Sequence, residues 1–224
     1  MNRAGFGVSL LCALTTVVTG CSATVAGFPT PASTVPIAQG TPLSTTTASP
    51  APSTRSTGSL SLPALFDATV SGVIAYVEDL GVEVDTPVAI PRTDTTMCLL
   101  SGAVARTCGS VIEYDAPQLT EDRTRYGDLP IRAIAAHETG HIVMSSLGAD
   151  TASTPDADSE ARANCITGAF LATDPAITSS TAGEAYNRTP LPRAGQGSYD
   201  AYRAGFTMSR DGVDPIPTCA RMLG

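Results

Sequence analysis

The segment Ile131–Gly148, IRAIAAHETGHIVMSSLG, constrains the fold of this chain most strongly. It is largely apolar, and it holds the only two histidines of the sequence, His137 and His141. Asp128 is a plausible helix N-cap before it, and Gly148 is a plausible stop. We therefore predict a helix that is buried over much of its surface and that carries both imidazoles.

The spacing of the two histidines indicates a metal site. Residues four apart lie on one face of an α-helix, so His137 and His141 can direct their imidazoles at one Zn²⁺ ion, about 2.0–2.1 Å from each nitrogen. Glu138 lies about 100° further round the helix, where it can reach a water bound to the ion. This H-E-x-x-H pattern predicts two zinc ligands and a general base. The alternative is a pair of hydrogen-bonded core histidines.

A catalytic zinc site also needs a third protein ligand and an open position. Since the chain has no third histidine, that ligand must be a carboxylate. We predict Glu160, which follows on the next expected helix, Pro155–Phe170, with Thr154 as its cap. Asp156 and Asp158 compete for this role, but they lie near the helix start and would more naturally cap it.

The N-terminal residues 1–20 are typical of a lipoprotein signal peptide. One basic residue, Arg3, precedes an apolar run, Val8–Val18, that is too short to span a bilayer. The run ends in VTGC, which resembles a bacterial lipobox and makes Cys21 the lipidated residue. An ordinary secretory signal is the alternative. We expect the protein to be anchored by lipid to the extracytoplasmic face of the cell membrane.

Residues 21–60 predict a tether between the lipidated cysteine and a folded domain at 61–224. Most of the tether consists of Ser, Thr, Pro, Ala and Gly. Such a segment buries too little apolar surface to offset the entropy of ordering it, and its prolines keep it extended. We expect it to hold the domain away from the membrane.

The cysteines agree with export. Of the six, Cys12 leaves with the signal and Cys21 carries lipid, so four remain in the domain. They are Cys98, Cys108, Cys165 and Cys219. An even number in an exported domain predicts disulfides, and four cysteines allow three pairings. The local pairing joins Cys98 to Cys108 and leaves Cys165 for Cys219. No C-x-x-C spacing supports the alternative of a thiolate metal site.

The rest of the domain predicts an α+β fold that is mostly helical. A helix from Ser61, its N-cap, to Gly81 is indicated by apolar residues at helical spacing, namely Phe66, Val70, Val73, Val77 and Leu80. A last helix is expected from Tyr199 to about Met208, capped by Ser198.

A small β element is expected ahead of the histidine helix. Val82–Ile90 is predicted to be extended, Cys98–Cys108 to be a loop or hairpin, and Ser110–Asp115 to be a short strand. The net charge of −8 argues against a nucleic-acid partner, because phosphate binding needs clustered cations.

Two motifs together resemble the neutral zinc metallopeptidase family. AAHETGHIV matches its H-E-x-G-H, and EARANCITGAF matches a second motif, E-x-x-A-D-C-x-x-G. The matching residues of the second motif are Glu160, Ala163, Cys165 and Gly168. The resemblance implies a zincin-like domain over residues 61–224. It also implies peptide-bond hydrolysis with Zn²⁺ held by His137, His141 and Glu160 and with Glu138 as base, acting on a peptide or protein of the cell envelope.

The chain departs from the family at two positions. Asn164 stands where the family has an Asp that would orient a ligating imidazole, and Gln196 stands where its C-terminal segment begins His-Gly, a histidine that would stabilise the oxyanion. Tyr114 and Tyr199 are further oxyanion candidates. Both departures favour an alternative function, a zinc-binding envelope lipoprotein with little catalysis that acts as a binding module.

Overall fold

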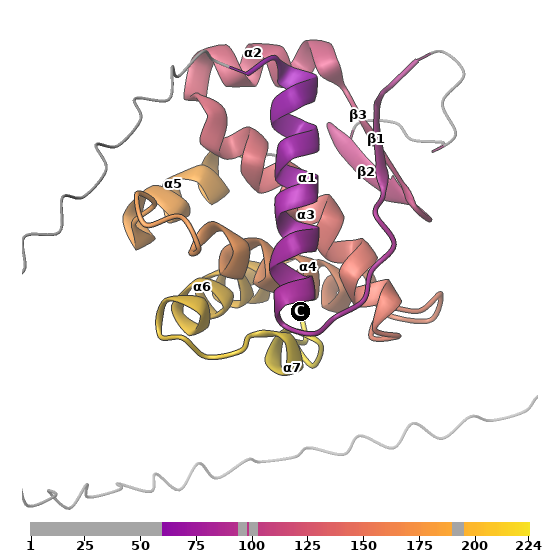
Figure 1. The fold of residues 1–224 in the computed structure, drawn as a ribbon, viewed down its shortest axis with the longest axis vertical. Coiled ribbons are helices and arrows are strands. Elements are labelled where there is room, and N and C mark those ends of the chain that lie inside the picture. Colours follow the sequence, from indigo (N-terminus) through magenta and orange to yellow (C-terminus); the bar gives the residue numbers. More distant parts are fainter. Residues whose placement is uncertain (1–59, 94–97, 99–102, 190–194) are drawn as a thin grey trace, which may run out of the picture. The chain divides into compact units, whose positions relative to one another are not determined.

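The computed structural model describes residues 60–93, Cys98, 103–189 and 195–224 (Figure 1). The predicted signal peptide, the lipidation site Cys21 and the tether as far as residue 59 lie outside the described residues. Among the described helices, none combines the length and apolar character that a membrane crossing requires.

The described chain is α+β and mostly helical, as predicted (Figure 1). In chain order its elements are α1 (Leu62–Asp79), β1 (Val88–Pro91), β2 (Ala105–Cys108), β3 (Val111–Tyr114), α2 (Ala116–Tyr126), α3 (Asp128–Ser146), α4 (Asp156–Leu171), α5 (Ser179–Arg188), α6 (Gly195–Arg210) and α7 (Ile216–Cys219).

The first helix, α1, agrees with its sequence pattern. Ser61 caps it by accepting a hydrogen bond from the Ala64 backbone N–H at 3.3 Å. Gly81 follows its end with φ +85°, a left-handed conformation that glycine adopts at little cost. Phe66, Val70, Val73 and Val77 are buried, Leu80 just past the helix is half-buried, and α1 packs against α3 (Figure 1). The predicted stripe is therefore core packing.

The sheet places β3 in the middle, in the order β1-β3-β2. β3 runs parallel to β1 and antiparallel to β2, and Gly109, at φ +61°, lies in the tight β2–β3 turn. The predicted strand at Ser110–Asp115 is confirmed as β3. The extended segment Val82–Ile90 becomes a strand only from Val88. In the described sheet, β2 is an edge strand, and its outer edge borders the cleft described below.

The histidine helix α3 is confirmed, but its predicted cap is wrong. Gly127 is the N-cap, with φ +82°, and Asp128 is the first helical residue. α2 ends and α3 begins at this one glycine. The positive φ of this turn is favourable for glycine and strained for a residue with a side chain. Asp128 instead pairs with Arg123 at 2.7 Å. Gly148, at φ +67°, follows the helix end as expected.

The predicted cap of α4 is also wrong. Pro155 occupies the N-cap position, and the preceding Thr154 uses its hydroxyl locally. Its Oγ1 accepts a hydrogen bond from the Thr151 backbone N–H at 2.8 Å, which closes the turn before the helix. A threonine next to a helix start therefore served the loop rather than the helix.

The last long helix, α6, begins at Gly195 rather than at Tyr199. Ser198, predicted as its cap, is fully buried within the helix. Three described helices, α2, α5 and the four-residue α7, were not predicted. α2 buries only Leu119, α5 buries Tyr186 and three small residues, and α7 is a single turn. Segments this short, with so few large apolar residues, offer no long apolar stripe to recognise in the sequence.

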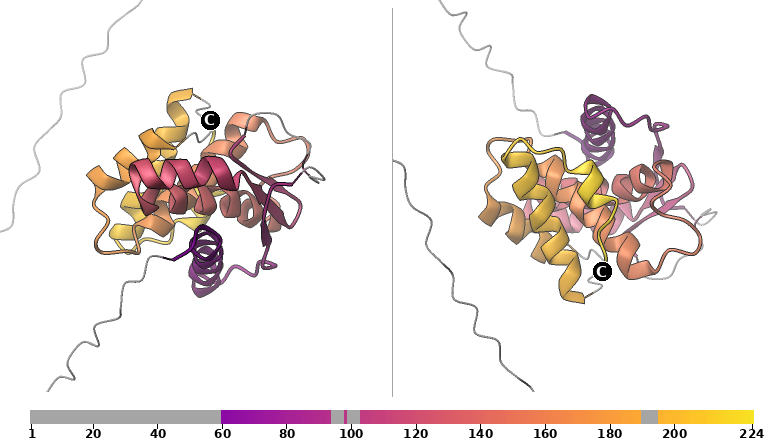
Figure 2. Two further views of the ribbon diagram at one scale, coloured as in Figure 1. Left: turned by 90° about the horizontal axis from the view of Figure 1, so that it is seen from above. Right: turned by 90° about the horizontal axis from the view of Figure 1, so that it is seen from below.

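Small residues set the distance between α4 and α6. α4 packs against both α3 and α6 (Figure 2). A Cβ added to Gly168 would collide with the Tyr202 carbonyl oxygen, and one added to Gly205 would collide with the Cys165 carbonyl oxygen. The two backbones therefore approach more closely than side chains would allow.

The structure joins Cys98 to Cys108 and Cys165 to Cys219, with Cα–Cα distances of 5.9 and 5.4 Å. The first bridge ties Cys98 to the end of β2. The second ties α7 to the helix that carries Glu160.

The Cys165–Cys219 disulfide, which closes the longer loop, should contribute more to stability than the Cys98–Cys108 disulfide. The bridged residues are 10 and 54 positions apart, which in the chain-entropy picture corresponds to about 3 and about 4 kcal/mol. The double variant Cys165→Ala/Cys219→Ala should therefore be less stable in urea than Cys98→Ala/Cys108→Ala. Peptide mapping without reductant checks the pairing, and four free thiols in the exported protein would contradict it.

Candidate metal centre

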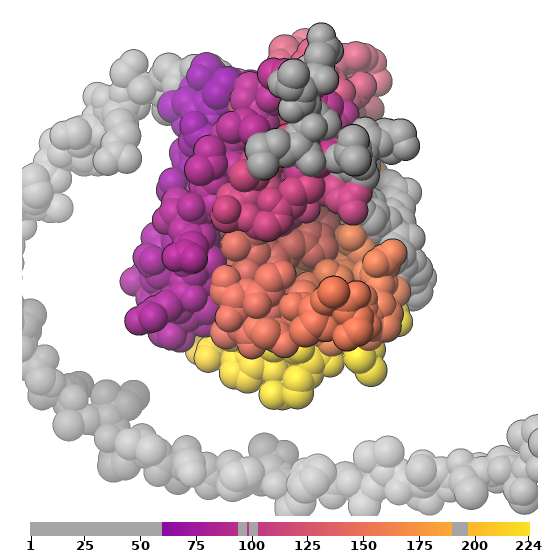
Figure 3. Space-filling view, turned by 90° about the vertical axis from the view of Figure 1, so that its right-hand side faces the viewer, coloured from indigo at the N-terminus to yellow at the C-terminus, as the bar shows by residue number. Residues whose placement is uncertain are grey.

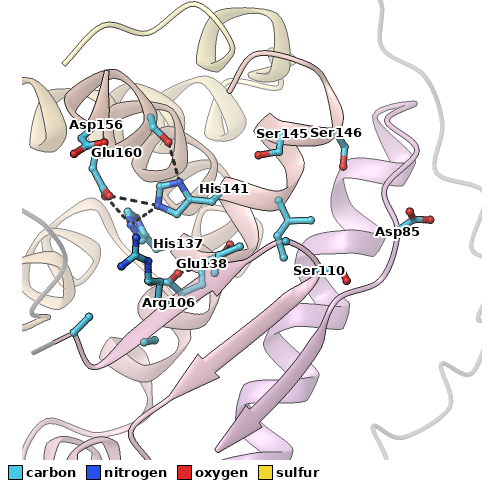
Figure 4. A pocket seen from close by; sticks show the side chains of 16 residues that line it. Asp85, Arg106, Ser110, His137, Glu138, His141, Ser145, Ser146, Asp156 and Glu160 are labelled. Atoms are coloured by element: carbon cyan, nitrogen blue, oxygen red, sulfur yellow. Dashed lines mark hydrogen bonds and ion pairs between the residues drawn. The ribbon is translucent and has the colours of Figure 1, made fainter. Parts of the chain in front are cut away.

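Three predicted metal ligands meet where α3 and α4 face each other (Figure 4). His137 Nε2 lies 2.9 Å from Glu160 Oε2, and His141 Nε2 lies 3.6 Å from Glu160 Oε1. The two Nε2 atoms are 3.2 Å apart. One ligand atom from each residue falls within 4.8 Å of the others, so the three side chains can share one ion.

A glycine in the histidine motif lets the two helices come this close. A Cβ at Gly140 would lie 2.9 Å from the Ala163 carbonyl oxygen and 3.0 Å from the Ala163 Cα. Glu160 lies one turn before Ala163, on the same face of α4. The contact between Gly140 and Ala163 therefore brings the Glu160 carboxylate onto the histidines.

The donor set fits a zinc ion. Two imidazole nitrogens and a carboxylate form a His₂Glu set, one of those found in catalytic zinc sites. Glu160 Oε2 is buried and lies 2.9 Å from His137 Nε2. The competing carboxylates are outside the cluster. Asp156 lines the cleft, and Asp158 accepts a hydrogen bond from the Gly224 N–H at 2.9 Å.

A neutral amide orients the first histidine. His137 is fully buried, and its Nδ1 lies 3.1 Å from Oδ1 of Asn164, which is also fully buried. This contact leaves Nε2 for the ion, as expected of a ligating imidazole. Asn164 Nδ2 has no hydrogen-bond partner among the described residues. Asn164 thus lies where the family resemblance implied, without the charge of an Asp.

A charged network orients the second histidine. His141 Nδ1 lies 3.2 Å from Ser159 Oγ, which donates to Asp150 Oδ2 at 2.6 Å. Arg162 donates to the other oxygen of Asp150 at 2.9 Å. The negative partner absent at His137 is therefore supplied, through a serine, at His141.

These contacts shift three pKa values. Burial lowers the pKa of His141, but hydrogen bonding to Asp150 and the charges of Glu138, Glu160 and Asp150 outweigh it and leave this pKa raised. Burial raises the pKa of Glu160, but hydrogen bonding to His137 and the charge of that ring leave it lowered. The pKa of Asp150 is likewise lowered: hydrogen bonds from His141 and other neighbours overcome its burial. Both carboxyl groups are therefore ionised at neutral pH.

Glu138 is held by the edge strand rather than by the ligand cluster. The residue is 7% exposed. Thr107 Oγ1, on β2, lies 2.7 Å from the Glu138 carbonyl oxygen and 3.0 Å from Glu138 Oε2. The carboxylate is therefore fixed beside the histidines without belonging to their ligand set.

A cleft of about 840 Å³ gives access to these groups. Its lining comes from β2 and the residues on either side of it, from α3, from the start of α4, and from Asp85 in the segment before β1. Figure 3 shows this face, where the sheet and the start of α4 border the hollow. The cleft is large enough for a short peptide segment.

Two of the three predicted oxyanion candidates, Tyr114 and Tyr199, are not among the described residues that line the cleft. Tyr114 is a core residue that stacks on Phe66, with ring centroids 4.4 Å apart. Tyr199 packs on Tyr186, with centroids 5.2 Å apart. Gln196 lies in the first turn of α6, and its side chain is outside the described part of the chain, so its role stays a prediction.

Sequence reasoning missed the residues that support the histidines and the glutamate. These are Thr107, Asp150 and Ser159. No sequence pattern identifies Thr107, because contacts between a strand and a helix depend on tertiary packing. For Asp150 the sequence holds a weak indication: the loop between α3 and α4 is short, so an acid in it must stay close to the ends of both helices.

Comparison with known protein families, with curated proteins and with solved structures found no match to this chain. The resemblance to the neutral zinc metallopeptidase family therefore rests on the chain's own motif residues.

Proposed function

We propose that this protein is a zinc-dependent peptidase that hydrolyses peptide bonds in the cleft. One observation carries the proposal: His137, His141 and Glu160 converge on one point of a cleft, with the separately held carboxylate of Glu138 in the same cleft. A pair of purely structural core histidines would not be expected to face a shared carboxylate at the bottom of an open cleft.

The residues divide into ligands and a base. His137, His141 and Glu160 would hold Zn²⁺, which supplies Lewis-acid activation of water when bound. Glu138 takes a proton from the attacking water and returns it to the leaving amine. Thr107 keeps Glu138 in place for both transfers. The domain is proposed to be zincin-like on this basis.

The proposed setting is the cell envelope. The support is in the sequence: a lipobox-like VTGC at Cys21, a tether rich in Ser, Thr and Pro, and an even number of cysteines in the domain. An enzyme anchored in this way would act on peptides or proteins near the membrane surface.

A second candidate function is a zinc-binding module with little catalysis. Asn164 favours it, because His137 has a neutral partner where a charged one would make the imidazole a stronger ligand. A peptidase assay on the purified protein across a broad peptide library, with and without a chelator, separates the two. Hydrolysis that the chelator abolishes supports the enzyme. Normal zinc binding without hydrolysis supports the module.

The protein should bind about one zinc ion per chain at neutral pH. Because the pKa of His141 is raised, a proton competes with the metal for this imidazole, so zinc affinity should weaken as the pH falls through that pKa and strengthen as it rises.

His137→Ala should abolish tight zinc binding, since the two remaining protein ligands rarely hold zinc. Elemental analysis and zinc titration at several pH values measure this, and the absence of zinc uptake would refute the metal site.

A further inference from the structure

Arg106 has a distinct place in the cleft. It lies on the edge strand β2, directly before Thr107, the residue that contacts the proposed base. It is exposed and lines the cleft. In Figure 4 its guanidinium points toward His137 and Glu160. A group bound by Arg106 would therefore lie in the same cleft as the proposed ligands and on their side of it.

Arg106 has no protein partner among the described residues, which sets it apart from most of the arginines there. Six described arginines pair with carboxylates. They are Arg92, Arg123, Arg125, Arg132, Arg162 and Arg188. Within the described part of the chain, no carboxylate or other acceptor therefore occupies the donors of the Arg106 guanidinium.

The charges around it make this arrangement selective. Arg106 is the one arginine in the described lining of the cleft, and the chain has no lysine. The acids of the lining are Asp85, Asp156, Glu138 and Glu160, and Arg106 pairs with none of them. The guanidinium is permanently charged, and its parallel N–H donors match the two oxygens of a carboxylate. It lies in a cleft whose other charged side chains are mostly acids, so it is the group there that would attract a carboxylate of a ligand.

We infer that Arg106 is a specificity-determining residue that binds a carboxylate of the substrate peptide beside the scissile bond. This inference rests on the proposed peptidase function for the identity of the ligand as a peptide. The carboxylate has two sources, an Asp or Glu side chain or the free C-terminus of a short peptide. Without Arg106, the charged groups of the described lining would be the four carboxylates and any protonated histidine.

The test measures binding rather than turnover. Zinc-loaded protein with Glu138→Gln, which cannot use the proposed base, is titrated with acetylated tetra-alanine as the free acid and as the amide. It is also titrated with amidated peptides in which one alanine, at each position in turn, is replaced by Glu or by Gln. We expect the charged peptide of at least one pair to bind roughly tenfold more tightly, the range of a charge-assisted hydrogen bond in a partly open site.

Two further variants assign the effect. Arg106→Gln should remove the preference, while Arg221→Gln, an arginine outside the cleft lining, should keep it. The pair that responds identifies the source: acid against amide for a C-terminus, Glu against Gln for a side chain. Equal binding within every pair, including no binding at all, overturns the inference. So does a preference that survives Arg106→Gln, because the carboxylate would then be bound by the metal.

The two proposals fail in different ways. Wild-type protein that hydrolyses no peptide, but whose Arg106-dependent preference persists, loses the peptidase function and keeps the carboxylate site. Wild-type protein that hydrolyses peptides with a chelator-sensitive rate, but without any charge preference, keeps the function and loses the site.

Discussion

Glu138→Gln should leave the zinc content near the wild-type value while peptide hydrolysis falls by about 10²–10⁴-fold, the usual loss for a general base. The glutamine keeps the size of the side chain and can still contact Thr107 Oγ1, but it cannot accept the proton of the attacking water. Glu138 is also absent from the cluster of ligand atoms, so the ion should not depend on it. Elemental analysis and initial rates on one peptide measure both effects.

Glu160→Gln is the matched comparison. It also replaces a carboxylate by an amide, but this carboxylate lies against both imidazoles, at 2.9 Å from His137 and 3.6 Å from His141. An amide oxygen is a weaker zinc ligand than a carboxylate, so affinity and activity should fall together. If Glu138→Gln lost the metal and Glu160→Gln kept it, the two roles would be exchanged.

Gly205→Ala should destabilise the fold by about 3 kcal/mol or more, because overpacking a buried contact typically costs 1–3 kcal/mol and this contact cannot relax by a side-chain rotation. The new Cβ would collide with the Cys165 carbonyl oxygen, which is backbone of α4. The helices would have to separate, and α4 carries Glu160. Urea unfolding measures the loss, and zinc titration of the folded fraction should show weaker binding.

Gly72→Ala is the control, since it makes the same chemical change in another helix. Its Cβ would meet only the ring of Phe170, at 3.2 Å, and a side chain can shift. Alanine is also favoured over glycine in a helix by about 1 kcal/mol. This variant should be close to wild type in stability. A Gly205→Ala protein as stable as Gly72→Ala would mean that α4 and α6 do not approach as closely as the structure shows.

Predictions from the sequence succeeded where a structure depends on neighbours in the chain. The helix that carries His137 and His141, the helix before the sheet and the strand β3 were all predicted from periodicity and short-range signals. Helix caps failed more often. Asp128 and Thr154 are residues that favour caps, yet Gly127 and Pro155 hold those positions. Which residue occupies the N-cap position depends on the path by which the chain enters the helix, and the residue type alone does not determine that path.

The sequence by itself determined the pairing of His137 with His141 and the nearby place of Glu138, because one turn of helix sets all three. Only the tertiary structure decided which carboxylate would join them. Glu160 reaches the histidines because Gly140 lets α4 approach α3. The partners of the site, from Thr107 on a strand to Asp150 in a loop, likewise depend on contacts between elements distant in sequence, and such contacts leave no fixed spacing to recognise.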